Sequence, residues 1–333
     1  MKLSVLITTY NLEQYIDQTI ESVLGQTTDF DFEILIGDDG STDATVQHIC
    51  AWKDKYPDKI KYFVMERQPN QIYNRIERAS KNRINLIEHA DGEYLIFLDG
   101  DDVYTDTMKL QKQITVLEAP ENQDCIACAH DIYLYWSEEK KERINNYTKS
   151  FKVSPKKYWR DGMYFHSDTV MFRNIFKKKF PKEIRKEYYD DNIIVFYLLK
   201  YGKIKYIPDV MVNYRQIEGS SWNSVSEFDK NIINLIDMGI EEQMNAALCR
   251  ESRMRHMYNI FFVWRNKKKI PSEIRTKYLP QAQNAELKEC VNWLCYEEVD
   301  FITRCRMNLK FFKDMFCFIF VKAGKIMRRN EYR

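Results

Sequence analysis

Strand-like and helix-like segments alternate along the first 120 residues, and this alternation constrains the fold more than any other feature. Short apolar runs rich in β-branched residues occupy residues 3–8, 32–36, 59–66 and 94–98. Each is followed by a segment with apolar residues at helical spacing, at residues 12–26, 45–56, 75–90 and 105–119. Parallel strands are joined by long, right-handed, usually helical crossovers, and both faces of their sheet are buried. The sequence therefore predicts an α/β fold with a mainly parallel sheet flanked by helices.

The chain is long enough for one large domain and an additional part. Its 333 residues exceed the usual domain size, so we expect an α/β domain of roughly 200 to 250 residues plus an appended piece. The pattern becomes mixed after residue 125 and largely helical from residue 226. We predict a domain at 1–225, with halves at about 1–103 and 104–225, and a helical C-terminal region at 226–333.

Composition excludes several classes of protein. A hydrophobic content of 44% and an aromatic content of 14% exclude a disordered chain. The net charge of +2, from 51 basic and 49 acidic residues, gives no reason to expect a nucleic-acid partner. The chain has neither an apolar run of membrane-spanning length nor the features of an export signal at its start, so its eight cysteines predict reduced thiols in the cytoplasm. Cys125 and Cys128 lack a second CxxC pair, and we expect them in the core.

Two acidic clusters follow predicted strands: Asp38-Asp39, and Asp99-Gly100-Asp101-Asp102. Ligands of open α/β sheets bind beyond the carboxyl ends of the strands, so both clusters are expected at one crevice. The carboxylates of residues 99–102 repel one another, and Mn²⁺ or Mg²⁺ would compensate them while neutralising a departing diphosphate. A solvated turn with Asp102 as a helix cap is the alternative. Residues 37–43 can likewise form a turn and a cap, or accept hydrogen bonds from a ribose or a base.

Other motifs narrow the chemistry. Neither a Walker loop nor GxGxxG occurs, so a diphosphate would be handled by the metal and by basic side chains, for which we consider Arg75, Arg78, Lys81 and Arg83. The alternative for these four residues is a solvated helix face. Asp190 and Asp191 precede an apolar helix. Either they are helix N-terminal residues favoured by the helix dipole, or one of them removes a proton from an acceptor hydroxyl. The histidine spacing does not support a zinc site.

Taken in order, several segments resemble glycosyltransferase family 2, whose members adopt the GT-A fold. They are SVLITTYN at 4–11, EILIGDDGSTD at 33–43, GEYLIFLDGDD at 92–102, HSDTVMFRNIF at 166–176, DDNIIVFYLLKYGKIKYI at 190–207 and NYRQIEGSSWN at 213–223. The resemblance implies a GT-A fold over 1–225, a nucleoside-diphosphate-sugar donor, with a uridine nucleotide favoured, and bound Mn²⁺ or Mg²⁺.

The same resemblance implies roles for individual residues. Thr8, Tyr10, Asp38 and Asp39 would hold the nucleoside, and Arg83 would lie near the diphosphate. Asp99, Gly100 and Asp101 match the DxD motif, with Asp101 and Asp99 as metal ligands. Asp191 would act as the general base of a single inverting displacement. Members often carry a histidine ligand where this chain has Ile217. His166, Glu218 and Trp222 are the candidates for the acceptor site.

The C-terminal segment has a composition of its own. Residues 301–333 contain nine basic residues against Asp314 and Glu331. A basic amphipathic segment can lie on an anionic membrane surface, and peripheral attachment would suit a lipid-linked acceptor. A helix packed on the rest of the protein explains the segment equally well. Homo-oligomer packing by residues 226–300 also remains open.

The sequence therefore predicts a glycosyltransferase that moves a sugar to a hydroxyl of a glycan or lipid-linked saccharide, with inversion, in cell-surface polysaccharide biosynthesis. The expected location is the cytoplasm or the cytoplasmic face of the membrane. The alternative is a sugar-nucleotide-binding or nucleotidyltransferase-like protein of the same fold that does not transfer sugar. A nucleotidyltransferase would be expected to carry a Gly-rich basic loop near the N-terminus, and residues 4–14 contain none.

Overall fold

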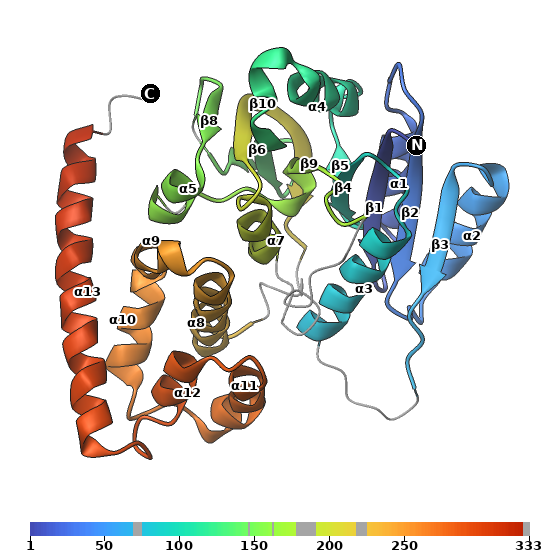
Figure 1. Cartoon of the computed structure of the whole chain (residues 1–333). Coiled ribbons are helices and arrows are strands. Elements are labelled where there is room, and N and C mark those ends of the chain that lie inside the picture. The colour runs from blue at the N-terminus through green and yellow to red at the C-terminus, as the bar shows by residue number, and fades with distance from the viewer. Residues whose placement is uncertain (69–74, 146, 162, 178–190, 218–224, 329–333) are drawn as a thin grey trace. The chain divides into compact units, whose positions relative to one another are not determined.

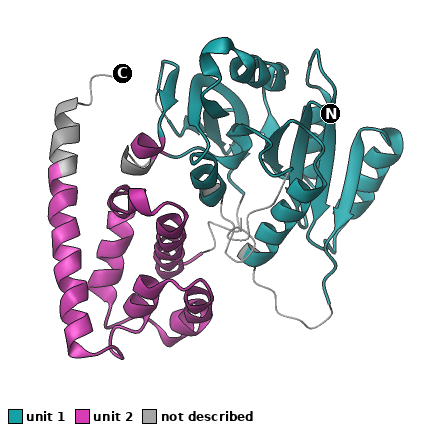
Figure 2. Ribbon diagram, viewed as in Figure 1, with its two compact units in different colours: residues 1–154, 164–218 teal, residues 155–163, 219–333 magenta. Residues whose placement is uncertain are grey.

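A computed structural model describes residues 1–68, 75–145, 147–161, 163–177, 191–217 and 225–328 (Figure 1). Side chains at 75–76, 159–161, 191–192 and 321–328 are outside this description. The chain divides into two compact units (Figure 2): unit 1 comprises Met1–Ser154 and Tyr164–Glu218, and unit 2 comprises Pro155–Met163 and Gly219–Arg333. The predicted division at residue 225 stays a prediction.

Unit 1 is built on one mixed sheet in the order β3-β2-β1-β4-β9-β6-β10-β5, with β7 beside β6 and β8 beside β10. The strands are β1 (Leu3–Thr9), β2 (Phe32–Asp38), β3 (Ile60–Val64), β4 (Tyr94–Asp99), β5 (Val103–Tyr104), β6 (Cys125–Tyr135), β7 (Lys141–Arg143), β8 (Phe151–Val153), β9 (Met171–Arg173) and β10 (Lys203–Arg215). The pairs that β1 forms with β2 and β4 are parallel, as are β2 with β3 and β6 with β10. Strand β9 is antiparallel to β4 and β6. The α/β fold with a largely parallel sheet is thus confirmed.

Alternate residues of β1 point to opposite faces of the sheet, as the two-residue period of a strand requires. Leu3, Val5 and Ile7 share a buried cluster with apolar residues of α1 (Ile16–Leu24), α2 (Thr45–Lys55) and α4 (Lys109–Glu118). Helix α3 (Arg75–His89) packs on β1 and β2. Its Asn82 amide donates to the carbonyl of Gly37 at 2.7 Å, and a Cβ at Gly37 would lie 2.1 Å from Asn82 Oδ1. The predicted core positions Cys125 and Cys128 are buried.

The first helix begins later than the periodicity suggests. Asn11 has a φ of 52°, so the chain turns there and α1 starts only at Ile16. The turn is held by the segment after β2: Ser41 Oγ accepts from the Asn11 N–H at 2.8 Å, and Asn11 Oδ1 accepts from the Thr42 N–H at 2.8 Å. Of residues 41–43, which could cap the next helix, Ser41 and Thr42 instead hold the loop that follows β1, whereas Asp43 Oδ1 accepts at 3.0 Å from the N–H of Thr45 at the start of α2.

Unit 2 is helical in its described part, as predicted for the C-terminal region. It contains α5 (Pro155–Asp161), α8 (Glu227–Met244), α9 (Cys249–Arg255), α10 (Met257–Asn266), α11 (Ser272–Asn284), α12 (Lys288–Leu294) and α13 (Phe301–Arg328). Its buried residues include Ile236, Ile260 and Trp293. Among the residues described, the helices are all too short or too polar to cross a membrane.

Candidate functional site

The carboxyl ends of β1, β2 and β4 bring the two acidic segments to one edge of the sheet. In the parallel register, Thr9 of β1 pairs with Asp38 of β2, and Thr8 pairs with Asp99 of β4. The Thr8 hydroxyl donates to Asp99 Oδ1 at 2.9 Å. This is the edge at which parallel sheets bind ligands.

Asp38 and Asp39 have different surroundings. Asp38 is fully buried, and its Oδ2 accepts from the N–H groups of Gly40 and Ser41 at 2.9 and 2.8 Å. Gly40 has a φ of 73°, which a residue with a side chain rarely adopts. Asp38 therefore holds the turn after β2.

Asp39 instead faces two guanidinium groups. Arg67 Nη2 lies 2.5 Å from Asp39 Oδ2, and Arg78 Nε bonds to Oδ1. The Arg67 guanidinium also stacks on the Tyr10 ring, with its carbon 4.0 Å from the ring centroid. Tyr10, Asp39, Arg67 and Arg78 thus form one group of aromatic and charged side chains at the end of β2. The sequence did not indicate Arg67.

Of the four cations considered for the diphosphate, two bond to the acidic clusters. Arg78 bonds to Asp39, and Arg83 Nη2 donates to Asp99 Oδ1 at 3.0 Å. Lys81 pairs with Glu77, 2.7 Å away on the exposed side of α3, and the side chain of Arg75 is outside the description. Burial raises the pKa of Asp99, but Arg83 and His166 outweigh it and hold that pKa below its usual value.

The turn after β4 brings its backbone close to β1. Gly100 N–H donates to the Thr8 carbonyl at 2.8 Å, and a Cβ at Gly100 would also lie 2.8 Å from that oxygen. The backbone carbonyl of Asp101 accepts from Arg215 Nη1 at 2.7 Å. In the metal-free protein, burial and the neighbouring charge of Asp99 raise the pKa of Asp101 to about 7. This turn is thus crowded with negative charge.

A buried histidine and a buried aspartate join the acidic turn from a distant segment. Asp99, Asp102, His166 and Asp168 each offer a ligand atom, and these atoms lie within 4.8 Å of one another. His166 and Asp168 are held by the 3₁₀ turn Ser167–Thr169, which leads into β9. Asp101 is not a member of this group. We expected His166 at the acceptor, but it lies among the carboxylates.

The four side chains fit a divalent cation. Asp102 Oδ1 accepts from the Arg215 N–H at 2.8 Å, whereas no N–H or hydroxyl group of the described residues donates to Asp102 Oδ2 or Asp168 Oδ2, and the two carboxyl groups interact with each other. Both residues are fully buried, and burial together with the other carboxylate raises the pKa of Asp102 well above its usual value. Buried carboxylate oxygens without a donor are costly, and carboxylate and imidazole groups are common ligands of divalent cations.

Lys109 is a second residue that sequence reasoning missed. It is fully buried, its ammonium donates to Gln113 Oε1 at 3.0 Å, and it lies 4.1 Å from the centroid of the Tyr104 ring. Burial lowers its pKa to about 7, although the negative charge of Asp168 acts in the opposite direction. A lysine on an amphipathic helix is normally assigned to solvent, so no local pattern distinguishes it.

A cavity of about 780 Å³ opens beside Arg215. Its lining combines aromatic and polar side chains from the ends of β6 and β10 and from the loop after β1. The residues are Asn11, Leu12, Glu13, Gln14, Tyr15, Asp43, Tyr135, Trp136, Arg215, Gln216 and Ile217. Ile217, the position where the family often has histidine, thus lines a cavity rather than the carboxylate group.

Three predicted residues cannot be placed in full. Glu218 and Trp222 lie outside the described residues. Asp191 begins α7 (Asp191–Leu198), but its side chain is outside the description. The roles predicted for them remain predictions.

Relatives of the chain include proteins of unknown and of known activity. An uncharacterized protein of Mycobacterium tuberculosis is 28% identical over 236 residues, which cover 67% of this chain and 61% of that protein. The chain thus spans less than two thirds of that relative's length. The Campylobacter jejuni GalNAc(5)-diNAcBac-PP-undecaprenol beta-1,3-glucosyltransferase is 38% identical over 102 residues, 30% of each protein.

Solved structures show the same fold. Residues 1–349 of Staphylococcus aureus TarS, in complex with UDP, superpose with a TM-score of 0.58 at 19% identity over 100% of this chain and 93% of that one. The mannosyltransferase PcManGT of Pyrobaculum calidifontis, in complex with GDP-Man and Mn²⁺, superposes with a TM-score of 0.51 at 13% identity. That superposition covers 89% of this chain and 84% of the mannosyltransferase. The predicted GT-A fold is confirmed.

The model of the family described as glycosyl transferase family 2 matches residues 4–180. More than half of the sequence therefore fits this model, and the chain belongs to glycosyl transferase family 2.

Proposed function

We propose that this protein transfers a sugar from a nucleoside diphosphate to a hydroxyl group of a glycan or lipid-linked saccharide. The observation that carries the proposal is the convergence, at one sheet edge, of Asp39 with its two arginines, Asp99 with Arg83, and the buried group of three carboxylates and one histidine. Membership of the family and the nucleotide ligands of TarS and PcManGT support a nucleotide-sugar donor. We favour a uridine nucleotide.

The nucleoside would bind at the end of β2 and the diphosphate at the end of β4. Tyr10 offers a ring face to the base, and Asp39 accepts hydrogen bonds from a base or ribose once the nucleotide displaces part of its contact with Arg67. Thr8 and Arg83 both bond to Asp99 and orient it. The Arg83 guanidinium would also bind a phosphate oxygen of the donor. We keep Asp38 and Gly100 in the site as residues that shape the backbone.

Asp99, Asp102, His166 and Asp168 would hold Mn²⁺ or Mg²⁺, with Asp101 beside them. When bound, the cation supplies positive charge against the negative charge that develops on the departing diphosphate. Arg215 fixes the turn from the other side through Asp102 Oδ1 and the Asp101 carbonyl. This arrangement keeps Asp99 of the predicted pair of ligands, has Asp102 and Asp168 where we predicted Asp101, and takes its histidine from position 166 in place of 217.

The acceptor would enter through the cavity beside Arg215. The exposed Trp136 and the neighbouring Tyr135 offer ring faces to a saccharide, and Asn11, Gln14 and Asp43 offer hydrogen-bonding groups. Asp191 would remove the proton from the acceptor hydroxyl, and the transfer would invert the anomeric centre. Glu218 and Trp222 remain candidates for the same acceptor.

The wider setting is part of the proposal as well. We place the reaction in the biosynthesis of a cell-surface polysaccharide, in the cytoplasm or at the cytoplasmic face of the membrane. A peripheral contact of the C-terminal tail with that membrane and a homo-oligomer remain predictions.

Titration calorimetry with UDP, GDP and dTDP, each with and without Mn²⁺, tests the donor site. We expect one nucleotide to bind in a metal-dependent way to the wild type, and Asp168→Ala to lose the metal dependence. Asp124→Ala is the matched control, because Asp124 is half-exposed and pairs with Lys152 and Lys203. If no nucleotide binds in a metal-dependent way, the proposal is wrong.

A second experiment separates binding from transfer. Asp191→Asn should bind the nucleotide as the wild type does but slow transfer by about 10²- to 10⁴-fold, the usual contribution of a general base. Turnover at the wild-type rate would remove Asp191 from this role. Donor binding by the wild type without any sugar transfer or release would favour the binding protein of the same fold.

A further inference from the structure

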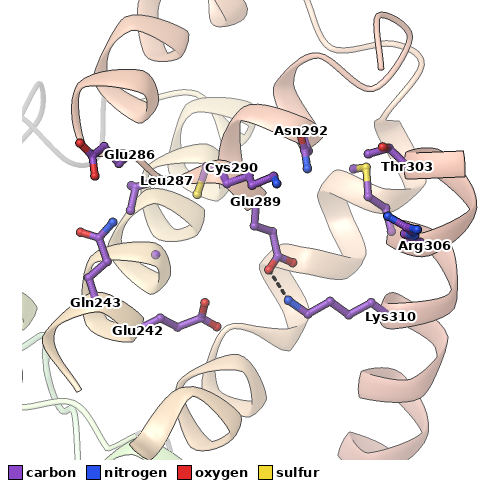
Figure 3. A pocket seen from close by; sticks show the side chains of 13 residues that line it. Glu242, Gln243, Glu286, Leu287, Glu289, Cys290, Asn292, Thr303, Arg306 and Lys310 are labelled. Atoms are coloured by element: carbon purple, nitrogen blue, oxygen red, sulfur yellow. Dashed lines mark hydrogen bonds and ion pairs between the residues drawn. The ribbon is translucent and has the colours of Figure 1, made fainter. Parts of the chain in front are cut away.

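One face of helix α13 packs on the other helices of unit 2 and forms ion pairs with them. Met307 and Phe311 are buried, and the Phe311 ring stacks on Trp264 of α10 with 4.5 Å between ring centroids. Asp314 Oδ2 accepts from Arg253 Nε at 2.7 Å. On the same side Lys310 bonds to Glu289 of α12 at 2.7 Å, across a cavity of about 510 Å³ (Figure 3). These contacts fix which side of α13 faces the interior.

The opposite face of α13 exposes a row of large apolar side chains. Each of them is between 56% and 76% exposed, and they recur along the helix at steps of one, three, four and seven residues. They are Phe301, Ile302, Leu309, Phe312, Phe316, Ile319 and Phe320. A soluble monomer normally exposes such residues singly, so a continuous row marks an interaction surface.

Helix α10 packs beside α13 and exposes two aromatic side chains of its own. Tyr258 and Phe261 are exposed, and Phe261 and Trp264 of α10 contact the aromatic rings of Phe311 and Phe312 on α13. We call the exposed row on α13, together with Tyr258 and Phe261, the apolar face. It is broad enough to involve two packed helices of the same unit.

The charge beside the apolar face is positive from residue 304 onward, whereas the exposed Glu297, Glu298 and Asp300 stand just before Phe301. Arg306 and Lys313 of α13 are exposed, as are Arg265, Lys268 and Lys269 at the end of α10. Asp314, the only acidic residue in the sequence from 301 to 320, bonds inward to Arg253. The sequence beyond residue 320 adds five basic residues and one acidic residue.

We propose that unit 2 binds an anionic lipid surface through this apolar face, with α13 lying in the plane of the interface. A helix that is apolar along one side and basic at its flanks binds in this way, because the apolar side chains enter the headgroup region and the cations meet anionic headgroups. A second copy of the chain is the competing occupant, since the spacing also suits helix pairing. Two such helices would bring Arg306 and Lys313 close to like charges, whereas an anionic lipid offers the opposite charge. The proposal does not depend on the reaction proposed above.

Flotation of the full-length protein with vesicles tests this surface. The vesicles contain phosphatidylcholine alone, or phosphatidylcholine with phosphatidylglycerol. We expect the wild type to float with the anionic vesicles, less with the neutral ones, and less at high salt because salt screens the cations. Leu309→Glu and Phe316→Glu should each abolish flotation, and Lys313→Glu should weaken binding to anionic vesicles by about fivefold or more.

The matched controls change exposed residues of unit 1. Tyr201→Glu and Lys53→Glu should float as the wild type does, because neither residue belongs to the apolar face. All variants alter exposed side chains, so circular dichroism should show unchanged thermal unfolding and separate a lost surface from a lost fold. If the wild type stays out of the floated fraction, or if Leu309→Glu and Phe316→Glu float as it does, the proposal is wrong. A dimer in light scattering that Leu309→Glu dissociates, without any flotation, would instead assign the face to a second copy.

Discussion

The two units of this protein both bury charged side chains, but they satisfy them differently. In unit 2, the almost fully buried Arg253 bonds to Glu289, Asp314 and Glu242. Its Nη2 donates to Glu289 Oε1 at 2.8 Å. In unit 1, the carboxyl groups of Asp102 and Asp168 are fully buried and interact with each other, and each has an oxygen to which no N–H or hydroxyl group of the described residues donates. A buried charge with partners becomes costly when one partner is removed, whereas a buried carboxyl group without a donor is costly from the start and indicates a bound ligand or a function.

The comparison predicts opposite changes in stability when a charged side chain is removed from one unit or from the other. Removing a charge from the Arg253 group leaves its partners buried and unpaired, so it should destabilise the protein. Removing a charge from the carboxylate group relieves repulsion, so it should stabilise the metal-free protein while weakening its hold on a cation. The predictions below test these signs, beginning with the largest expected effect.

Arg253→Ala should lower the free energy of unfolding by about 3–5 kcal/mol, the usual cost of leaving a buried ion pair without one partner. Asp314 would then lose its cation, and Glu289 would keep only Lys310 as a cation. Urea denaturation followed by circular dichroism measures the change. Arg275→Ala is the control, because Arg275 pairs with the exposed Glu298 and should cost about 1 kcal/mol or less. Equal costs at the two positions would show that the Arg253 group stabilises unit 2 no more than a surface pair does.

Glu289 should make the stability depend on pH in the acid range. Burial raises its pKa, but Arg253 and Lys310 outweigh burial and lower the pKa from 4.5 to about 2. A carboxyl with a depressed pKa in the folded state contributes stability that is fully present above its unfolded pKa and lost as the pH falls through the folded pKa. The contribution, about 3 kcal/mol, should therefore decline as the pH falls from about 5 toward 2.

Glu289→Gln is the variant that isolates this dependence. At pH 7 its free energy of unfolding should be lower than that of the wild type. The difference between the two free energies, measured by urea titration, should become smaller as the pH is lowered. A difference that stays constant with pH would mean that Glu289 acts through packing and not through its charge.

The fold was predictable because its signals are local, while much of the site was not. The apolar runs at 3–8, 32–36 and 94–98 became parallel strands, and the acidic residues after them met at one edge because parallel strands end on the same side. The start of α1 was misjudged because Asn11 turns the chain, which apolar spacing cannot reveal.

The other residues of the site depend on tertiary contacts. Arg67 reaches Asp39 and Tyr10 from beyond β3, and Arg215 reaches the acidic turn from the end of β10. His166 and Asp168 come to the carboxylates only because β9 inserts between β4 and β6. The segment at 166–176 indicated His166 as a candidate for the acceptor site, but the spacing of His166 and Asp168 also occurs at His89 and Asp91 and does not show which pair reaches the carboxylates.

The sharpest comparison of the two units comes from Asp102→Asn. The new amide keeps an oxygen for the Arg215 N–H, and its NH₂ group can donate to Asp168 Oδ2. We expect the free energy of unfolding of the metal-free variant at pH 7 to be about 1–2 kcal/mol higher than that of the wild type, because the neutral amide satisfies a buried acceptor and avoids the cost of burying or protonating a carboxylate. Added Mn²⁺ should raise the melting temperature of the wild type by binding the folded state, but not that of the variant. Asp124→Asn, which alters an exposed and paired carboxylate, should leave the response to Mn²⁺ unchanged. If Asp102→Asn instead loses stability in the absence of metal, then Asp102 serves the fold as Glu289 does, and the contrast between a paired structural group and an unpaired functional one no longer holds.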